Sequence, residues 1–175
     1  PGNADGEPQS LTNVNGTLFF TVNSTGPGRE LWKSDGTSAG TVLVKDILPG
    51  PAESGIGGLT NINGTLFFRA NDGTHGIELW KSDGTGGGTV MIRDIRSGPE
   101  TSIPVLLTNV NGTVFFRAHD AEHSYELWKT DGTTAGTVLV KDINPGGSES
   151  FPMNLTNVNG TLLFTAVSPF AGAEL

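Results

Sequence analysis

The sequence contains no cysteine, two methionines and a single tyrosine. Without cysteine the chain forms no disulfide, carries no thiolate nucleophile and offers no zinc–thiolate site. Positive charge is also scarce, because 10 Lys and Arg residues stand against 18 Asp and Glu residues, and the formal net charge is −8. An acidic surface repels the phosphate backbone of nucleic acids, so we expect no nucleic-acid partner. No apolar run approaches the roughly 18 residues of a membrane helix, so we expect no membrane span.

Turn-forming residues are abundant, with 26 Gly and 10 Pro among 175 residues. One eight-residue stretch, Glu-Leu-Trp-Lys-Ser-Asp-Gly-Thr, starts at Glu30 and returns at Glu78, at Glu126 with Thr130 replacing Ser, and begins again at Glu174. The spacing is 48 residues each time. A period of this length without helical patterning indicates an array of one β-rich supersecondary unit.

Each unit is predicted to hold four short strands, which in the first unit are residues 11–14, 17–22, 30–34 and 41–45. An Asn-Gly pair separates the first two strands and favours a type I′ hairpin, in which both turn residues have positive φ. The second strand contains three adjacent apolar residues, Leu18-Phe19-Phe20, instead of an alternating pattern. Both faces of that strand are therefore expected to be covered, as in sheets stacked face to face.

These features predict an all-β fold made of β-propeller blades, each with four antiparallel strands. The chain is expected to be a single repeat array over residues 1–175, with blades at 11–58, 59–106 and 107–154 and a partial blade at 155–175. The alternative is a parallel β-helix or solenoid, whose Gly-, Asn- and Thr-rich coils also stack. The Asn-Gly hairpins and the lack of an internal half-repeat favour the propeller.

The eight-residue stretch, followed by Gly40-Thr41, resembles the bacterial ELWxxDGTxxGT tandem-repeat proteins, and the resemblance covers nearly the whole chain. It implies a propeller-like fold and a large, secreted or surface-associated protein, so we expect an extracellular or cell-surface location. It implies no catalytic residues.

A propeller closes with about four to eight blades. Because this chain holds three units and part of a fourth, its ring is expected to be incomplete. The expected partners are therefore the remainder of a longer chain or further copies that complete the ring, and we favour a fragment of a longer array. Unpaired edge strands recruit such partners.

Loops two and four differ between units, whereas loops one and three barely change. In an up-and-down blade the two variable loops lie at the same end, and loops on a rigid scaffold are where binding usually sits. We predict a recognition face there, although variable loops are also expected where nothing constrains them. The candidate residues are Arg29, Asp72, His75, His119, Asp120, His123 and Tyr125.

The repeated motif supplies three structural residues per unit. Its Asp is expected to accept backbone N–H bonds in a turn, and its Trp to pack between blades. Its Glu shares the Trp side of the strand, and because carboxylates are rarely buried alone, we expect it to bind backbone N–H groups or a basic side chain. These residues are Glu30, Trp32, Asp35, Glu78, Trp80, Asp83, Glu126, Trp128 and Asp131.

No catalytic constellation stands out, since the sequence has no Ser-His-Asp set, phosphate loop or dinucleotide fingerprint. A calcium site needs several carboxylates in one short loop, and each Asp-Gly turn has only one. His119 and His123 share a loop with Asp120 and could bind zinc, but we expect this loop to be solvated and free of metal. We therefore expect no metal, no cofactor and no enzymatic activity.

The predicted function is a scaffold, adhesion or protein-interaction module of a larger extracellular bacterial protein, with a protein or glycan ligand. The alternative is a glycan-binding, lectin-like propeller.

Overall fold

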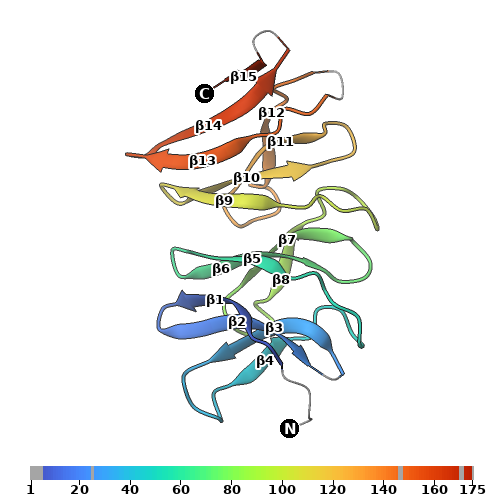
Figure 1. Ribbon diagram of the computed structural model, residues 1–175, viewed down its shortest axis with the longest axis vertical. Coiled ribbons are helices and arrows are strands. Elements are labelled where there is room, and N and C mark those ends of the chain that lie inside the picture. The colour runs from blue at the N-terminus through green and yellow to red at the C-terminus, as the bar shows by residue number, and fades with distance from the viewer. Residues whose placement is uncertain (1–5, 25, 146–147, 170–171, 175) are drawn as a thin grey trace.

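The computed structural model describes residues 6–24, 26–145, 148–169 and 172–174 (Figure 1). In this part of the chain all regular structure is β-strand, without a helix. Strands consecutive in sequence form three four-stranded sheets and one three-stranded sheet. Sheet 1 contains β1 (Gln9–Val14), β2 (Thr17–Ser24), β3 (Gly28–Ser34) and β4 (Val42–Lys45). Sheet 2 contains β5 (Gly57–Ile62), β6 (Thr65–Asn71), β7 (Ile77–Ser82) and β8 (Val90–Arg93). Sheet 3 contains β9 (Val105–Val110), β10 (Thr113–His119), β11 (Tyr125–Thr130) and β12 (Val138–Lys141). Sheet 4 contains β13 (Met153–Val158), β14 (Thr161–Ser168) and β15 (Gly172–Glu174).

Every strand pair in the described sheets is antiparallel. The predicted all-β fold with four-stranded antiparallel sheets is confirmed, and the alternative of a parallel β-helix is wrong. The Asn-Gly hairpins are also confirmed: Asn63 has φ 51° and Gly64 has φ 81°, both in the left-handed region that a type I′ turn requires.

The four sheets follow one another along the longest axis of the molecule (Figure 1). Apolar side chains fill the two junctions between sheets 1 and 2 and between sheets 2 and 3. Phe19 of sheet 1 and Phe68 of sheet 2 belong to the first cluster, whereas Phe67 belongs to the second. Adjacent Phe67 and Phe68 therefore face opposite neighbours, which explains why the strand lacks an alternating pattern.

Neighbouring sheets approach each other most closely at their first strands, where β1 lies against β5, β5 against β9, and β9 against β13. There the Asn61 side chain donates to Asn13 O over 2.8 Å. The fourth strands are bridged instead by long side chains: Lys45 Nζ donates to Thr89 O over 2.8 Å, and Arg93 donates to Thr137 O. The sheets thus diverge from their first strands towards their fourth strands.

The turn after the third strand depends on one glycine. The Asp83 carboxylate accepts hydrogen bonds from the backbone N–H and the hydroxyl of Thr85, both over 2.8 Å. A Cβ at Gly88 would lie 2.1 Å from this carboxylate, and the equivalent clash occurs at Gly40 and Gly136. Asp83 could make room for a Cβ only by giving up its hydrogen bonds to Thr85, so the motif favours glycine at this position.

We therefore expect Gly88→Ala to lower the melting temperature by about 5 °C, because Asp83 must leave its turn. Gly87→Ala is the matched control, since a Cβ at Gly87 meets nothing within 4 Å. Thermal unfolding followed by circular dichroism measures both. Equal melting temperatures for the two variants would contradict this role of the glycine.

Candidate functional site

The variable loops meet at one end of each unit. The loop after β8 is joined to the start of β7, next to the loop after β6, by a hydrogen bond from Ser102 N to Ile77 O over 3.1 Å. A Cβ at Gly76 would lie 2.1 Å from Glu100 O, so the two loops touch backbone to backbone. The nearly invariant Asn-Gly turns lie on the opposite side, towards the left in Figure 1. The loops that differ between units therefore share one end, which we call the variable end.

Two of the candidate histidines are paired with aspartates in their own loops. His75 Nδ1 lies 2.8 Å from Asp72 Oδ2, and Asp72 Oδ1 accepts the backbone N–H groups of Thr74 and His75. The same Asp-x-x-His arrangement recurs in the third unit, where His123 Nδ1 lies 3.0 Å from Asp120 Oδ2. The hydrogen bond that each imidazole donates to its aspartate raises the pKa of His75 and of His123. Both pairs shape their loops.

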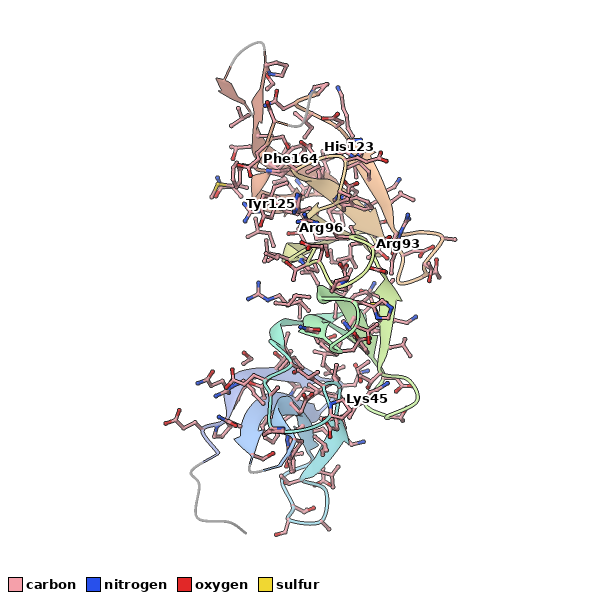
Figure 2. The ribbon with its side chains drawn as sticks, turned by 90° about the vertical axis from the view of Figure 1, so that its right-hand side faces the viewer. Lys45, Arg93, Arg96, His123, Tyr125 and Phe164 are labelled. Carbon is pink, nitrogen blue, oxygen red and sulfur yellow. The ribbon has the colours of Figure 1, made fainter. Side chains whose placement is uncertain are left out.

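His119 and Tyr125 belong to an aromatic and guanidinium cluster at the variable end of the third unit. The rings of His119 and Tyr125 lie 5.2 Å apart, and Tyr125 stacks on Phe151 at 5.5 Å. The Arg117 guanidinium lies over both the Tyr125 and the Phe151 rings, at 5.4 and 5.6 Å. Arg96 Nη1 lies 2.8 Å from His119 Nδ1, and Arg96 and Tyr125 are neighbours in Figure 2. This arrangement is a partly exposed aromatic surface with two cations.

Burial and then the Arg96 charge lower the pKa of His119. His119 is therefore neutral near pH 7, and its Nδ1 accepts a hydrogen bond from Arg96. Arg96 also forms an ion pair with Glu100 at 3.6 Å.

The sequence analysis missed Arg96, Arg117 and Phe151. Phe151 could have been noticed from the sequence. It is a large aromatic residue at a position where the first two units hold Gly55 and Ile103.

Arg29 lies in the first unit, where it contacts Thr21 Oγ1 at 3.5 Å and Glu53 at 3.9 Å. The structure thus distributes the seven candidate residues over three units. It joins Asp72 with His75, Asp120 with His123, and His119 with Tyr125, but it assembles no site that contains all of them.

A cavity of about 310 Å³ opens between sheets 2 and 3 below the variable loop of the third unit. The Arg93 guanidinium lies 6.0 Å from the centre of the Trp128 ring on one side of it. Its lining residues are Arg93, Ile95, Ser97, Asp120, Ala121, Glu122 and Trp128. The lining combines hydrogen-bond donors, carboxylates and an aromatic ring.

The motif residues lie within the framework of the sheets. Trp80 and Trp128 are buried in the two junctions, whereas Trp32 is partly exposed because no sheet precedes sheet 1 in the described structure. The exposed Asp35, Asp83 and Asp131 each accept the N–H of the Thr two residues later. These hydrogen bonds, led by those from the Thr side chains, lower the pKa of all three aspartates.

The motif glutamates are fully buried. Glu30, Glu78 and Glu126 have no exposed surface, and no ion pair among the described residues includes them. Glu78 Oε2 accepts Ile95 N over 3.1 Å and Oε1 accepts Arg96 N over 3.3 Å. The expectation that these glutamates bind backbone N–H groups is confirmed. Burial raises the pKa of Glu30 and of Glu78 to about 7, and it raises the pKa of Glu126 as well.

The described residues contain no group of three or more His, Asp or Glu side chains that could hold a metal ion. In particular, the zinc arrangement of two histidines with Asp120 is not formed, because His119 is bound to Arg96 and only His123 contacts Asp120. The helix search over the described residues likewise found none of the length and apolarity required to cross a membrane. Comparison of the chain with protein-family models and with curated proteins gave no match.

Proposed function

We propose that the chain is a non-enzymatic, propeller-like scaffold from an extracellular or cell-surface bacterial protein, which joins further repeats through its sheet faces and presents its variable end to a partner. The divergence of the sheets supports a radial arrangement. Neighbouring sheets touch at their first strands, whereas long side chains span the distance between their fourth strands. Sheets spaced in this way resemble wedges placed around an axis. A ring of such wedges leaves the variable loops on one rim.

The observation that carries the proposal is an uncovered apolar face on sheet 4. Phe19 and Val14 of sheet 1 face sheet 2 and are 3% and 6% exposed. The residues at the same positions of sheet 4 are Leu163 and Val158, which are 39% and 43% exposed. In sheets 1 and 2 this apolar face packs against the following sheet. Sheet 4 has the same face, but no described sheet covers it. A further repeat of the same kind would fit against this face.

Sheet 1 carries the complementary face. Leu59 of sheet 2 packs against the junction with sheet 1, and the equivalent residue, Leu11, is 62% exposed. The two uncovered faces are the two halves of one repeated junction. Association between them would be heterologous, head to tail, and would close into a ring or continue as a filament.

Mixing two variants tests this association. We expect the wild-type chain to self-associate in analytical ultracentrifugation, and Leu11→Glu and Leu163→Glu each to be monomeric, because each variant lacks one half of the junction. A mixture of the two variants retains one intact pair of faces and should form a 1:1 dimer. Ser38→Glu, in an exposed loop, adds the same charge as a control and should leave association unchanged. A wild-type chain that stays monomeric at high concentration would contradict the proposal.

The cavity between sheets 2 and 3 supports a second candidate, a glycan-binding propeller. Carboxylates, a guanidinium and an indole are groups that bind sugar hydroxyls and sugar faces. A glycan array separates the two functions. Saturable binding that Glu122→Ala abolishes would favour the lectin, whereas the scaffold is expected to bind no sugar.

A further inference from the structure

Each buried motif glutamate holds the loop that follows the fourth strand at its base. In the second unit, Glu78 accepts the N–H groups of Ile95 and Arg96 at the start of that loop. Its Oε2 also lies 2.6 Å from Ser102 Oγ at the end of the same loop. One carboxyl group therefore joins β7 to both ends of the loop at residues 94–102.

The arrangement recurs in the other units. Glu126 Oε2 accepts Ile143 N over 3.1 Å and lies 2.6 Å from Ser150 Oγ. Glu30 accepts Ile47 N and Leu48 N over 3.0 and 3.3 Å. We call these three groups the glutamate clamps. They hold the loops that build half of the variable end, including those that carry Arg96 and Phe151.

Counting hydrogens at the serine indicates where a proton lies. Ser150 Oγ is 3.0 Å from Tyr125 O and 2.6 Å from Glu126 Oε2, and both neighbours are acceptors when the carboxyl group is ionised. A hydroxyl carries one hydrogen and cannot donate to both. If Glu126 is protonated, its O–H donates to Ser150 Oγ, and Ser150 donates to the Tyr125 carbonyl. Only the protonated acid satisfies both short contacts.

The charges around the clamp oppose its ionisation. Asp94, at the end of β8, is the nearby charge that raises the pKa of Glu78, and Asp46 and Asp142 act in the same way on Glu30 and Glu126. His75, in the loop after β6, is a cation when protonated and favours ionisation of Glu78, but it forms its ion pair with Asp72. No described Lys or Arg forms an ion pair with a clamp, and Glu126 Oε1 has no hydrogen-bond partner. A full negative charge would thus be buried without an ion-pair partner among the described residues.

We propose that Glu30, Glu78 and Glu126 form proton-operated clamps, which are protonated when the loops of the variable end are held closed and which release those loops when they ionise. The pKa of Glu78 in the closed state is about 7, above the ordinary 4.5. A group whose folded pKa is raised contributes stability that is complete below the ordinary value and is lost as the pH rises through about 7. The clamps therefore hold the variable loops firmly in acid and loosely above neutral pH.

Amide hydrogen exchange of residues 94–103 at pH 6 and pH 8, normalised to the intrinsic exchange rate, tests the clamp at Glu78. Opening exposes the carboxyl group to water and restores its ordinary pKa. We therefore expect the protection factor of this loop to fall about tenfold between the two pH values. Glu78→Gln removes the titrating group: its amide nitrogen takes the place of Oε2 and donates to Ser102, and its carbonyl oxygen still accepts the N–H of Arg96, whereas the N–H of Ile95 loses its acceptor. This variant should keep the same protection at both pH values.

His75→Gln and Glu53→Gln are the controls. The first removes the nearby Asp72–His75 pair, and the second removes an exposed carboxylate; both should retain the tenfold change. The side-chain carboxyl carbon of Glu78 in the wild-type chain gives a measurement without substitution, with an expected titration midpoint near pH 7 in NMR. A midpoint below pH 5, or a Glu78→Gln variant whose protection still falls tenfold between pH 6 and pH 8, would overturn the proposal. Neither experiment contains a partner, so the outcome is independent of the proposed scaffold function.

Discussion

Glu78→Ala is expected to lower the free energy of unfolding by about 4 kcal/mol at pH 6, because it leaves two backbone N–H groups without an acceptor in a buried site. These donors belong to Ile95 and Arg96, and water does not reach the position of the carboxyl group, since Glu78 has no exposed surface. The loss of the side chain adds a cavity beside β7. Urea denaturation followed by tryptophan fluorescence measures the change.

The comparison with Glu78→Gln separates hydrogen bonding from charge. Gln keeps an acceptor for the N–H of Arg96 but not for the N–H of Ile95, so at pH 6 this variant should retain only part of the stability that Glu78→Ala loses. Glu53→Ala is a control at an exposed side chain and should change the free energy of unfolding by less than about 0.5 kcal/mol. If Glu78→Ala were as mild as Glu53→Ala, the glutamate would not hold the loop.

Phe68→Ala is expected to cost about 3–5 kcal/mol of unfolding free energy, which is typical of removing a fully buried phenylalanine. Phe68 has no exposed surface, stacks on Trp80 at 6.5 Å and lies in the cluster between sheets 1 and 2. Its removal opens a void between the two sheets. We also expect the loss to weaken cooperativity, since this junction couples the first sheet to the rest.

Phe164 occupies the same position in sheet 4 and is partly exposed. Phe164→Ala should therefore cost about 1–2 kcal/mol, clearly less than Phe68→Ala. Chemical denaturation of both variants measures the contrast. Equal losses would contradict the expectation that the cost of the substitution follows the burial of the ring.

The repeat made the local structure predictable. Asn-Gly between apolar stretches sets both turn dihedrals, so the hairpin at Asn63 followed from two residues and their neighbours. The adjacent residues Phe67 and Phe68 predicted that both faces of their strand are covered. Successive side chains in a strand point to opposite faces, and here an apolar ring lies on each face. The link between Glu78 and Ser102 was also within reach, since a serine recurs at the same distance behind each of the first three motif glutamates.

The cluster at the variable end was not predictable in the same way. Arg96 and Phe151 lie in loops of different units, and they meet His119 and Tyr125 only because the loops after the second and fourth strands share one end. No local rule gives the distance between residues so far apart in sequence. Arg117 resembled an ordinary solvated strand residue, and only the structure places its guanidinium over two rings.

The side chains of Lys45 and Arg93 donate to the backbone carbonyls of Thr89 and Thr137. Neither hydrogen bond therefore depends on which side chain the following unit carries at that position. A backbone carbonyl persists through almost any amino-acid replacement. Gene duplication that adds or deletes a whole 48-residue unit therefore creates another junction of the same kind without a compensating mutation. The length of such an array is free to change during evolution, while the surface carried by each unit diverges separately.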